Sequence, residues 1–357
     1  MVDDILRRIL MSVRHLLLTV AMLVYFNSSM MGQVVQPVPV KIIFDTDLGP
    51  DCDDAGALAV LHGLETLGEA KILGVMASTT SPWCSPCTDA INTYYGRGDI
   101  PVATLKGPGS PGGSEEWYGD SFNGFIAGYF PNRVRHKEYA LDAVYLYRKL
   151  LSSQADSSVV IVVTGAITNL RDLLVSGVDS LSPLDGLSLV RQKVKLLSVM
   201  GGIYPRGQES NFMVDPPATR KVVADWPTPI MFSGFEIGED LLTGSRLKTE
   251  TPENNPVAAA YHLWDLHFAR QFEPGFDPDQ AIWPHSSFDQ TAVLYGVRGL
   301  QNYWDIQQRG YNHILEDGSN EWRESPDKDH FYLIEKMPRL ELARIIEDLM
   351  VIPPPAR

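Results

Sequence analysis

The feature that most constrains this chain is a strand, an acidic loop and a helix that follow one another within residues 41–62. Apolar residues over 42–44 predict a buried strand, and apolar residues at helical spacing after residue 54 predict a helix. A Gly-Pro pair marks a turn between them. The stretch between strand and helix carries a dense group of carboxylates: Asp45, Asp47, Asp51, Asp53 and Asp54.

Neighbouring carboxylates repel one another, so a fold that gathers them needs a counter-charge. Carboxylate oxygens suit a hard divalent cation such as Ca²⁺ or Mg²⁺, and no set of His or Cys residues competes for it here. The alternative is that Asp53 and Asp54 only stabilise a helix N-terminus. Capping leaves the other acids unexplained, which favours a cation site.

Length and composition bound the fold. A chain of 357 residues allows one large α/β domain or two ordinary ones, and 44% hydrophobic residues allow a sizeable core. A net charge of −14 disfavours nucleic acid or an anionic membrane as partner. Because no boundary divides residues 33–357, we expect a single domain there.

The N-terminus resembles a targeting segment. Arg7, Arg8 and Arg14 precede an apolar run over residues 16–26, and small and polar residues follow it. This pattern predicts a signal peptide over residues 1–32 and export of the rest to the periplasm or the medium. The run is shorter than the roughly 20 residues of a membrane span. An uncleaved anchor is the alternative; after cleavage no stable membrane partner is expected.

Strand patterns alternate with helical ones along the chain, which is typical of parallel βαβ units. Strands are expected near residues 42–44, 71–76, 100–103, 158–163, 194–200 and 228–233. Helices are expected near residues 89–95, 139–151, 254–272 and 339–351, whereas residues 300–338 give no predicted element. The pattern predicts an open, mostly parallel sheet flanked by helices, with ligands bound beyond the carboxyl ends of its strands.

Three later stretches place polar residues at such ends. From the residues alone, 164–170 is a strand–turn–helix with Thr168 as N-cap, and Asp215 caps a helix that starts at Pro216. Glu209 and Asn211 lie two residues apart, so in an extended segment they would face one side and could bind vicinal hydroxyls.

Together these motifs resemble the nucleoside hydrolases, the inosine–uridine-preferring family, over roughly residues 41 to 297. The matching stretches are Asp45-Thr46-Asp47 with Asp53-Asp54, Thr164 to Asn169, Glu209 to Asn211 with Asp215-Pro216, and Asp289 at a helix start. The family usually has two residues fewer before its Asp pair. Asp51 and Asp53 therefore stay alternatives for the ribose contact. The resemblance implies a Rossmann-like nucleoside hydrolase fold.

The resemblance also implies a function, the hydrolysis of the N-glycosidic bond of a ribonucleoside to free base and ribose. In this family pattern Asp47 is both a Ca²⁺ ligand and the general base on a Ca²⁺-bound water. Asp54, Asp289 and the backbone carbonyl of Thr164 complete the ligand set. The implied partner is a small-molecule ribonucleoside, and the oligomeric state, monomer or homo-oligomer, is left open.

For the substrate, the resemblance implies that Asp53 and Asn211 hold ribose and that Glu209 binds its far hydroxyls. One branch of the family has His before the last Asp, where it assists the leaving base. Here that residue is Phe288, an aromatic that could stack on a purine. His285, three residues earlier, is a possible substitute.

Two other functions stay open from the sequence. An apolar strand followed by Asp45-Thr46-Asp47 also fits a haloacid-dehalogenase-type phosphatase, with Asp45 as nucleophile. An exported Ca²⁺-dependent nucleoside or sugar binder without turnover is the non-enzymatic alternative. Cys84 and Cys87 have redox spacing in an expected loop, where a local disulfide or a free thiol is favoured over catalysis.

Overall fold

The structure, a computed structural model, describes residues 1, 11, 38–106, 122–272, 284–325 and 328–356. Its contacts divide the chain into Met1–Val38 and Pro39–Arg357, and the second unit carries the fold. The expected signal peptide lies outside the described residues, apart from Met1 and Met11. Among the helices that the structure describes, none has the length and apolar character to cross a membrane.

The second unit is built on an eleven-stranded sheet. In spatial order its strands are β4 (Leu141–Asp142), β3 (Val102–Thr104), β2 (Ala70–Ala77), β1 (Val40–Thr46), β5 (Val159–Val163), β6 (Val194–Met200), β8 (Ile230–Ser233), β13 (His330–Glu335), β11 (Trp304–Ile314), β12 (Asn320–Glu324) and β7 (Arg206–Gly207). Pairing is parallel from β4 to β13. The expected open, mostly parallel sheet is confirmed.

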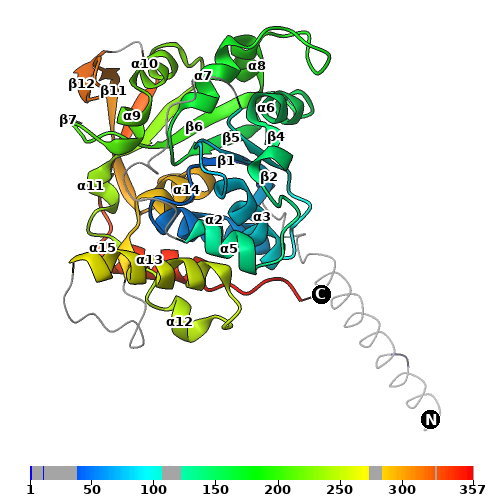
Figure 1. Cartoon of the computed structure of the whole chain (residues 1–357). Coiled ribbons are helices and arrows are strands. Elements are labelled where there is room, and N and C mark those ends of the chain that lie inside the picture. Colours follow the sequence, from blue (N-terminus) through cyan, green and yellow to red (C-terminus); the bar gives the residue numbers. More distant parts are fainter. Residues whose placement is uncertain (2–10, 12–37, 107–121, 273–283, 326–327, 357) are drawn as a thin grey trace. The chain divides into compact units, whose positions relative to one another are not determined.

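Helices cover both faces of this sheet (Figure 1). They are α2 (Asp53–Thr66), α3 (Cys84–Tyr94), α5 (Asn123–Tyr129), α6 (Ala143–Ser152), α7 (Thr168–Val175), α8 (Gly186–Lys193), α9 (Ser210–Val214), α10 (Pro216–Asp225), α11 (Phe235–Gly238), α12 (Leu247–Glu250), α13 (Pro256–Phe272), α14 (Phe288–Arg298) and α15 (Arg339–Met350). A 3₁₀ turn spans Lys137–Tyr139, and β9 (Leu242–Thr243) pairs with β10 (His285–Ser286).

Strand β1 shows why the sheet has two covered faces. Ile42 and Phe44 are fully buried in the core shared with α2, α14 and α15, whereas Ile43 is fully buried in the core shared with α6, α7 and α8. Side chains alternate between the faces of a strand, so an uninterrupted apolar run fits only a strand that is buried on both sides. This position between β2 and β5 brings the residues that follow β1 to the middle of the carboxyl edge.

The region after residue 300 was not predicted correctly. Instead of a tail it forms β11, β12 and β13, and β11 pairs antiparallel with both of the others. Strand β13 then joins the parallel part through β8. Antiparallel strands with one covered face carry polar residues on the other face, which hides them among loops in a sequence.

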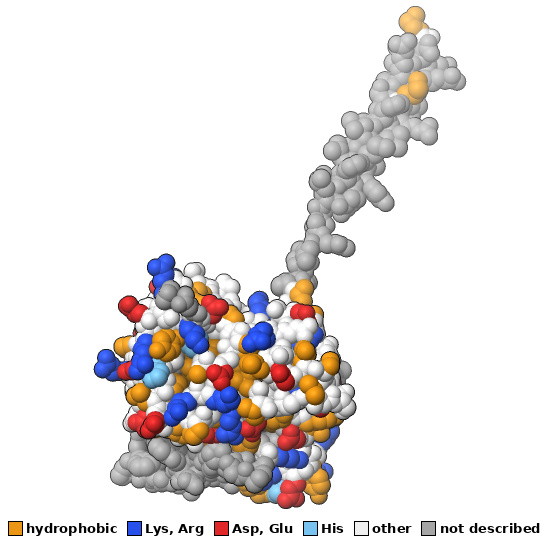
Figure 2. Space-filling view, turned by 90° about the horizontal axis from the view of Figure 1, so that it is seen from above, with side chains coloured by type: hydrophobic (Ala, Val, Ile, Leu, Met, Phe, Trp, Pro, Cys, Tyr) orange, Lys and Arg blue, Asp and Glu red, His pale blue; other side chains and the backbone are white. Residues whose placement is uncertain are grey.

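Seen from above, the described part of the molecule has a mixed surface. Lys and Arg side chains lie interspersed with Asp and Glu over the coloured part of that face (Figure 2). This part of the surface therefore offers no extended field of one sign.

Candidate functional site

The site is built at the carboxyl edge of the parallel strands. Asp47 directly follows β1, Thr164 directly follows β5, and the N-terminus of α14 brings Asp289 to the same place. The amide of Thr164 donates to the carbonyl of Asp45 at 2.8 Å, which continues the β1–β5 pairing up to the loops. Residues from distant parts of the chain are thus held by adjacent strands.

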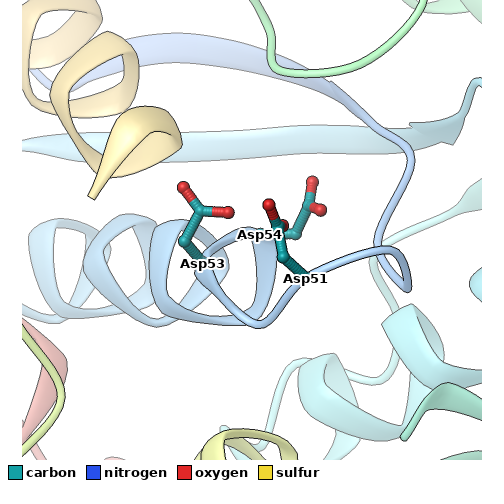
Figure 3. A group of neighbouring side chains, drawn as sticks. All are labelled: Asp51, Asp53 and Asp54. Atoms are coloured by element: carbon teal, nitrogen blue, oxygen red, sulfur yellow. The ribbon is translucent and has the colours of Figure 1, made fainter. Parts of the chain in front are cut away.

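Three carboxylates cluster where the loop meets α2. Oxygens of Asp51, Asp53 and Asp54 all lie within 4.8 Å of one another. Figure 3 shows the three side chains projecting to one side from the loop and the first turn of α2. Such a spacing is suited to a shared cation and is unfavourable for bare charges.

Asp289 joins this cluster through Asp54, because the two side chains share a hydrogen bond. Burial, and then the charges of Asp47 and Asp51, raise the pKa of Asp54 well above its usual value. Burial is also the main cause that raises the pKa of Asp289, followed by the charges of Asp53, Asp54 and Asp51. Asp54 therefore interacts with both Asp47 and Asp289, the other carboxylates that the sequence analysis expected as metal ligands; their role as ligands stays a prediction.

Asp53 has a different set of contacts. Its Oδ2 accepts the backbone N–H of Phe288 at 2.9 Å and of Asp289 at 3.0 Å. Ser287, the N-cap residue of α14, makes no side-chain capping bond of its own. Asp53 therefore caps α14 from the start of α2, and it fixes Asp289 beside Asp54. A capping role does exist here, but for another helix than the sequence suggested.

Two threonine hydroxyls lie against the carboxylate of Asp54. Thr46 donates its hydroxyl to Oδ1 of Asp54, and the hydroxyl of Thr164 lies 3.3 Å from the same oxygen. The carbonyl of Thr164 accepts Nδ2 of Asn211 at 3.1 Å. The predicted neutral ligand and a predicted ribose contact are therefore in direct contact with each other.

The expected extended segment around Glu209 is wrong. Glu209 is the N-cap of α9, and its carboxylate accepts the amides of Gly202, Asn211 and Phe212 at 3.1, 2.7 and 3.3 Å. Burial, partly offset by these bonds, raises the pKa of Glu209. Its carboxylate positions Asn211 by ordering the first turn of α9.

The helix starts that follow were predicted in part. Asp215 caps α10 by accepting the amide of Ala218 at 3.1 Å, and Pro216 opens that helix, as predicted. Thr168 is not the N-cap of α7 but its first residue, and its hydroxyl donates to Asp215 at 2.8 Å. Arg171 also binds Asp215, at 3.0 Å, so α7 and α10 are tied together at the edge of the site.

Asp45 belongs to the interior and not to the cluster. It is fully buried and accepts the hydroxyl of Tyr147 at 2.7 Å and the amide of Asn169 at 3.1 Å. Burial outweighs these hydrogen bonds and raises the pKa of Asp45 to about 7. Its place below the loop anchors β1 to α6 and α7.

An aromatic pair that the sequence did not reveal flanks α14. Phe288 stacks on Phe235 with ring centroids 4.7 Å apart, and both rings are half-buried. Phe235 opens α11, directly beyond β8, so its position at the carboxyl edge was the only available signal. Next to this pair, His285 on β10 is bonded to Asp265 of α13.

The cysteines occupy other surroundings than expected. Cys84 and Cys87 lie in the first turn of α3 and not in a loop, and both are fully buried thiols that form no disulfide. Burial raises the pKa of Cys87, and the charge of Asp54 raises it further. A thiol that resists ionisation is a poor nucleophile, so this pair is not suited to redox catalysis.

Comparison with known proteins identifies the scaffold. The family model described as inosine-uridine preferring nucleoside hydrolase matches residues 42–319. The chain belongs to this family. Its Asp cluster is consistent with the metal dependence of nucleoside hydrolases. No curated protein sequence matches the chain.

Solved structures support the same fold. A purine-preferring ribonucleoside hydrolase from Gardnerella vaginalis is 15% identical with a TM-score of 0.65, over 87% of this chain and 96% of that one. A plant nucleoside hydrolase, PpNRh1, is 18% identical with a TM-score of 0.62, over 88% and 100%. The effector protein XOO4466 is 15% identical with a TM-score of 0.64, over 88% and 94%. At these identities the likeness concerns the nucleoside hydrolase fold alone.

Proposed function

We propose that this member of the nucleoside hydrolase family cleaves the N-glycosidic bond of a ribonucleoside to free base and ribose. The observation that carries the proposal is the convergence of Asp47, Asp54 and Asp289 at one edge of the sheet. Family membership supports hydrolysis of nucleosides in general. The ribonucleoside as substrate and the roles of single residues are our proposal.

The residues present fit a hard divalent cation, and we propose Ca²⁺. The proposed donors are all oxygens of buried residues: the carboxylates of Asp47, Asp54 and Asp289 and the carbonyl of Thr164. Of these, Asp54 also lies within 4.8 Å of Asp51 and Asp53. Oxygen donors of this kind suit Ca²⁺ better than softer metals. When bound, such a cation lowers the pKa of a nearby water and attracts the ribose hydroxyls.

Asp47 is the proposed general base. It follows β1 directly, and it lies near enough to Asp54 for its charge to raise the pKa of that carboxylate. It would take the proton from the attacking water as the bond to the anomeric carbon forms. The three proposed ligand carboxylates carry one negative charge more than a double positive charge neutralises, and Asp51 and Asp53 add to the acidity of the site. That charge favours a sugar with oxocarbenium character over the neutral ground state.

The contacts sharpen the roles proposed for substrate binding. Asn211 stays a proposed ribose contact, since its amide already lies beside the carbonyl of Thr164. Asp53 and Glu209 are largely engaged with backbone amides, so their proposed ribose contacts would use the remaining lone pairs. Phe288, supported by Phe235, is the proposed stacking surface for the base.

Export is a further proposal, and it rests on the basic and apolar pattern of residues 1–32. The net charge of −14 supports a small-molecule substrate over nucleic acid. An exported nucleosidase would act on nucleosides outside the cytoplasm.

The phosphatase alternative is disfavoured by the place of Asp45. A nucleophilic carboxylate must reach its substrate, and Asp45 is fully buried and bound to Tyr147 and Asn169. The binder alternative is not decided by the fold, which the chain shares with hydrolases and with the effector XOO4466 alike. Turnover therefore has to be measured directly.

The test is a free-base assay over a panel of ribonucleosides and ribonucleotides, with Ca²⁺ and with a chelator. We expect free base from at least one nucleoside and loss of that activity with the chelator. Phosphate release without free base would favour the phosphatase. Binding of a nucleoside without any release of base would favour the binder.

A further inference from the structure

Hydrolysis of a nucleoside needs more than a general base that takes a proton from the attacking water. The glycosidic nitrogen leaves with the bonding electron pair, and a purine or pyrimidine anion is a poor leaving group unless it receives a proton. Phe288 has no proton to give. The side chain that meets this need has to lie beside the acidic loop and be able to carry a proton near neutral pH, which is characteristic of histidine.

His285 is a histidine in the stretch that leads to Phe288. It lies on β10, three residues before Phe288, and its side chain is 23% exposed. The amide of Phe288, three residues further on, donates to Asp53 at 2.9 Å, which holds this stretch beside the acidic loop. Its ring centroid is 6.0 Å from that of Tyr261, which limits the directions in which the ring can turn.

The backbone that carries His285 is held from two sides. His285 pairs with Thr243 of β9, and the hydroxyl of Thr243 lies 2.7 Å from that of Ser287. The amide of Ser287 donates to the carbonyl of Gly238 at 3.1 Å. These bonds fix the short stretch between His285 and Phe288.

The imidazole itself is oriented by a buried carboxylate. Nε2 of His285 is hydrogen-bonded to Oδ1 of Asp265, which is 2% exposed and projects from α13. A carboxylate acceptor fixes the proton on Nε2, so that a second proton has to lie on Nδ1. The titratable groups around the ring are Asp265 and Tyr261 from α13 and Asp51 from the loop.

We propose that His285 is the proton donor to the leaving base and that Asp265 is its positioning residue, an assignment that rests on the proposed function. As the C–N bond breaks, its electron pair passes to the base and the Nδ1 proton of His285 moves to a ring nitrogen. The water oxygen bonds to the anomeric carbon and its proton passes to Asp47. Exchange with solvent then returns both residues to their starting states.

The assignment is tested with two substrates that differ in their need for a proton. Inosine requires protonation of its base, whereas p-nitrophenyl β-D-ribofuranoside releases a stable anion. In His285→Gln and His285→Ala, we expect kcat/KM to fall about 100-fold for inosine and to stay within about threefold for the nitrophenyl riboside. Asp265→Asn should change the same ratio by about tenfold. His262→Ala, on the same helix as Asp265, is the control and should leave the ratio unchanged.

The outcomes separate the alternatives. Equal losses on both substrates would show a structural role and overturn the assignment, as would unchanged inosine hydrolysis in both His285 variants. A wild-type protein that cleaves the nitrophenyl riboside but none of the ribonucleosides would keep the proposed chemistry at the sugar and overturn the role of His285. A wild-type protein that cleaves neither substrate would overturn the proposed function and this assignment with it.

Discussion

Arg148 and Asp54 are both buried charged side chains, 2% and 1% exposed, and their surroundings differ. The guanidinium of Arg148 binds both carboxylate oxygens of Asp179, at 2.7 and 3.0 Å, and donates to Ser176 and to the carbonyl of Leu184. Around Asp54 the neighbours are other carboxylates. Among the residues that the structure describes, none donates a Lys or Arg group to the members of the acidic cluster, Asp51, Asp53, Asp54 and Asp289.

The comparison separates a buried charge that has an oppositely charged partner from buried charges that have none. Buried charges are tolerated when each is paired and hydrogen-bonded, which describes Arg148. The acidic cluster lacks a Lys or Arg partner within the described chain, which supports the proposed cation. The first arrangement stabilises the fold, and the second is suited to chemistry.

The largest effect is expected at Asp47. Asp47→Asn removes the proposed general base while it keeps the size of the side chain, so kcat for a nucleoside should fall about a thousandfold, or about 4 kcal/mol. Asp225→Asn, at an exposed pair with Lys221, is the matched control and should retain activity. Steady-state release of free base measures both. An Asp47→Asn variant with unchanged activity would show that the acidic cluster takes no part in the reaction.

The second largest effect is expected on the stability of the protein when the paired charge of Arg148 is removed. Arg148→Met leaves Asp179 and two buried carbonyl groups without their partner, and should lower the free energy of unfolding by about 3 kcal/mol. Because this site needs no metal, the loss should be the same with and without Ca²⁺. Urea unfolding followed by circular dichroism measures it. A Ca²⁺-dependent loss would contradict the separation of the two regions.

His62 is a buried side chain that the fold keeps in its neutral form. Burial, and then the charge of Arg97, lowers the pKa of His62 to about 3, and Nε2 lies 2.9 Å from Oδ1 of Asn92. A pKa that is lower in the folded state gives stability that is complete above pH 6.5 and is lost as pH falls toward 3. As the pH falls from 6.5 to 5, protonation of His62 in the unfolded state should lower the free energy of unfolding by about 2 kcal/mol. His62→Gln should abolish that part of the pH dependence in urea unfolding, and an unchanged slope would disprove the prediction.

The smallest effect is expected on the stability of the metal-free protein when a carboxylate of the acidic cluster is replaced. Asp54→Asn removes one repelling charge, so the metal-free protein should gain about 1 kcal/mol of stability at pH 8. The same variant should lose the rise in melting temperature that Ca²⁺ gives to the wild type. Thermal unfolding with and without chelator measures both. Destabilisation of the metal-free variant would mean that Asp54 is needed for its hydrogen bonds and not for a cation.

The parallel half of the fold could be predicted from its sequence because local and global signals agree there. Apolar runs such as 194–200 become strand β6 with the expected bounds, since a strand buried on both faces must be apolar throughout. The approach of Asp289 to Asp54 was expected from the resemblance to the nucleoside hydrolases, and not from a local signal.

The rest required information that the sequence does not carry locally. Glu209 is an uncommon helix cap, so α9 was mistaken for an extended segment. Asp53 caps a helix that starts 235 residues later, a contact that only the packing of α2 against α14 creates. Phe235 has no motif around it and gains meaning only from Phe288. In each case a tertiary contact decides the role.

The central claim is that acids from both ends of the chain share one cation. Isothermal titration of the purified protein with Ca²⁺ tests it most directly, with Asp289→Asn as the variant. The account predicts one Ca²⁺ per chain for the wild type, and binding at least about 100-fold weaker for a folded Asp289→Asn protein, a loss of about 3 kcal/mol. A wild type that takes up no divalent cation, or an Asp289→Asn variant that binds Ca²⁺ equally well, would contradict it.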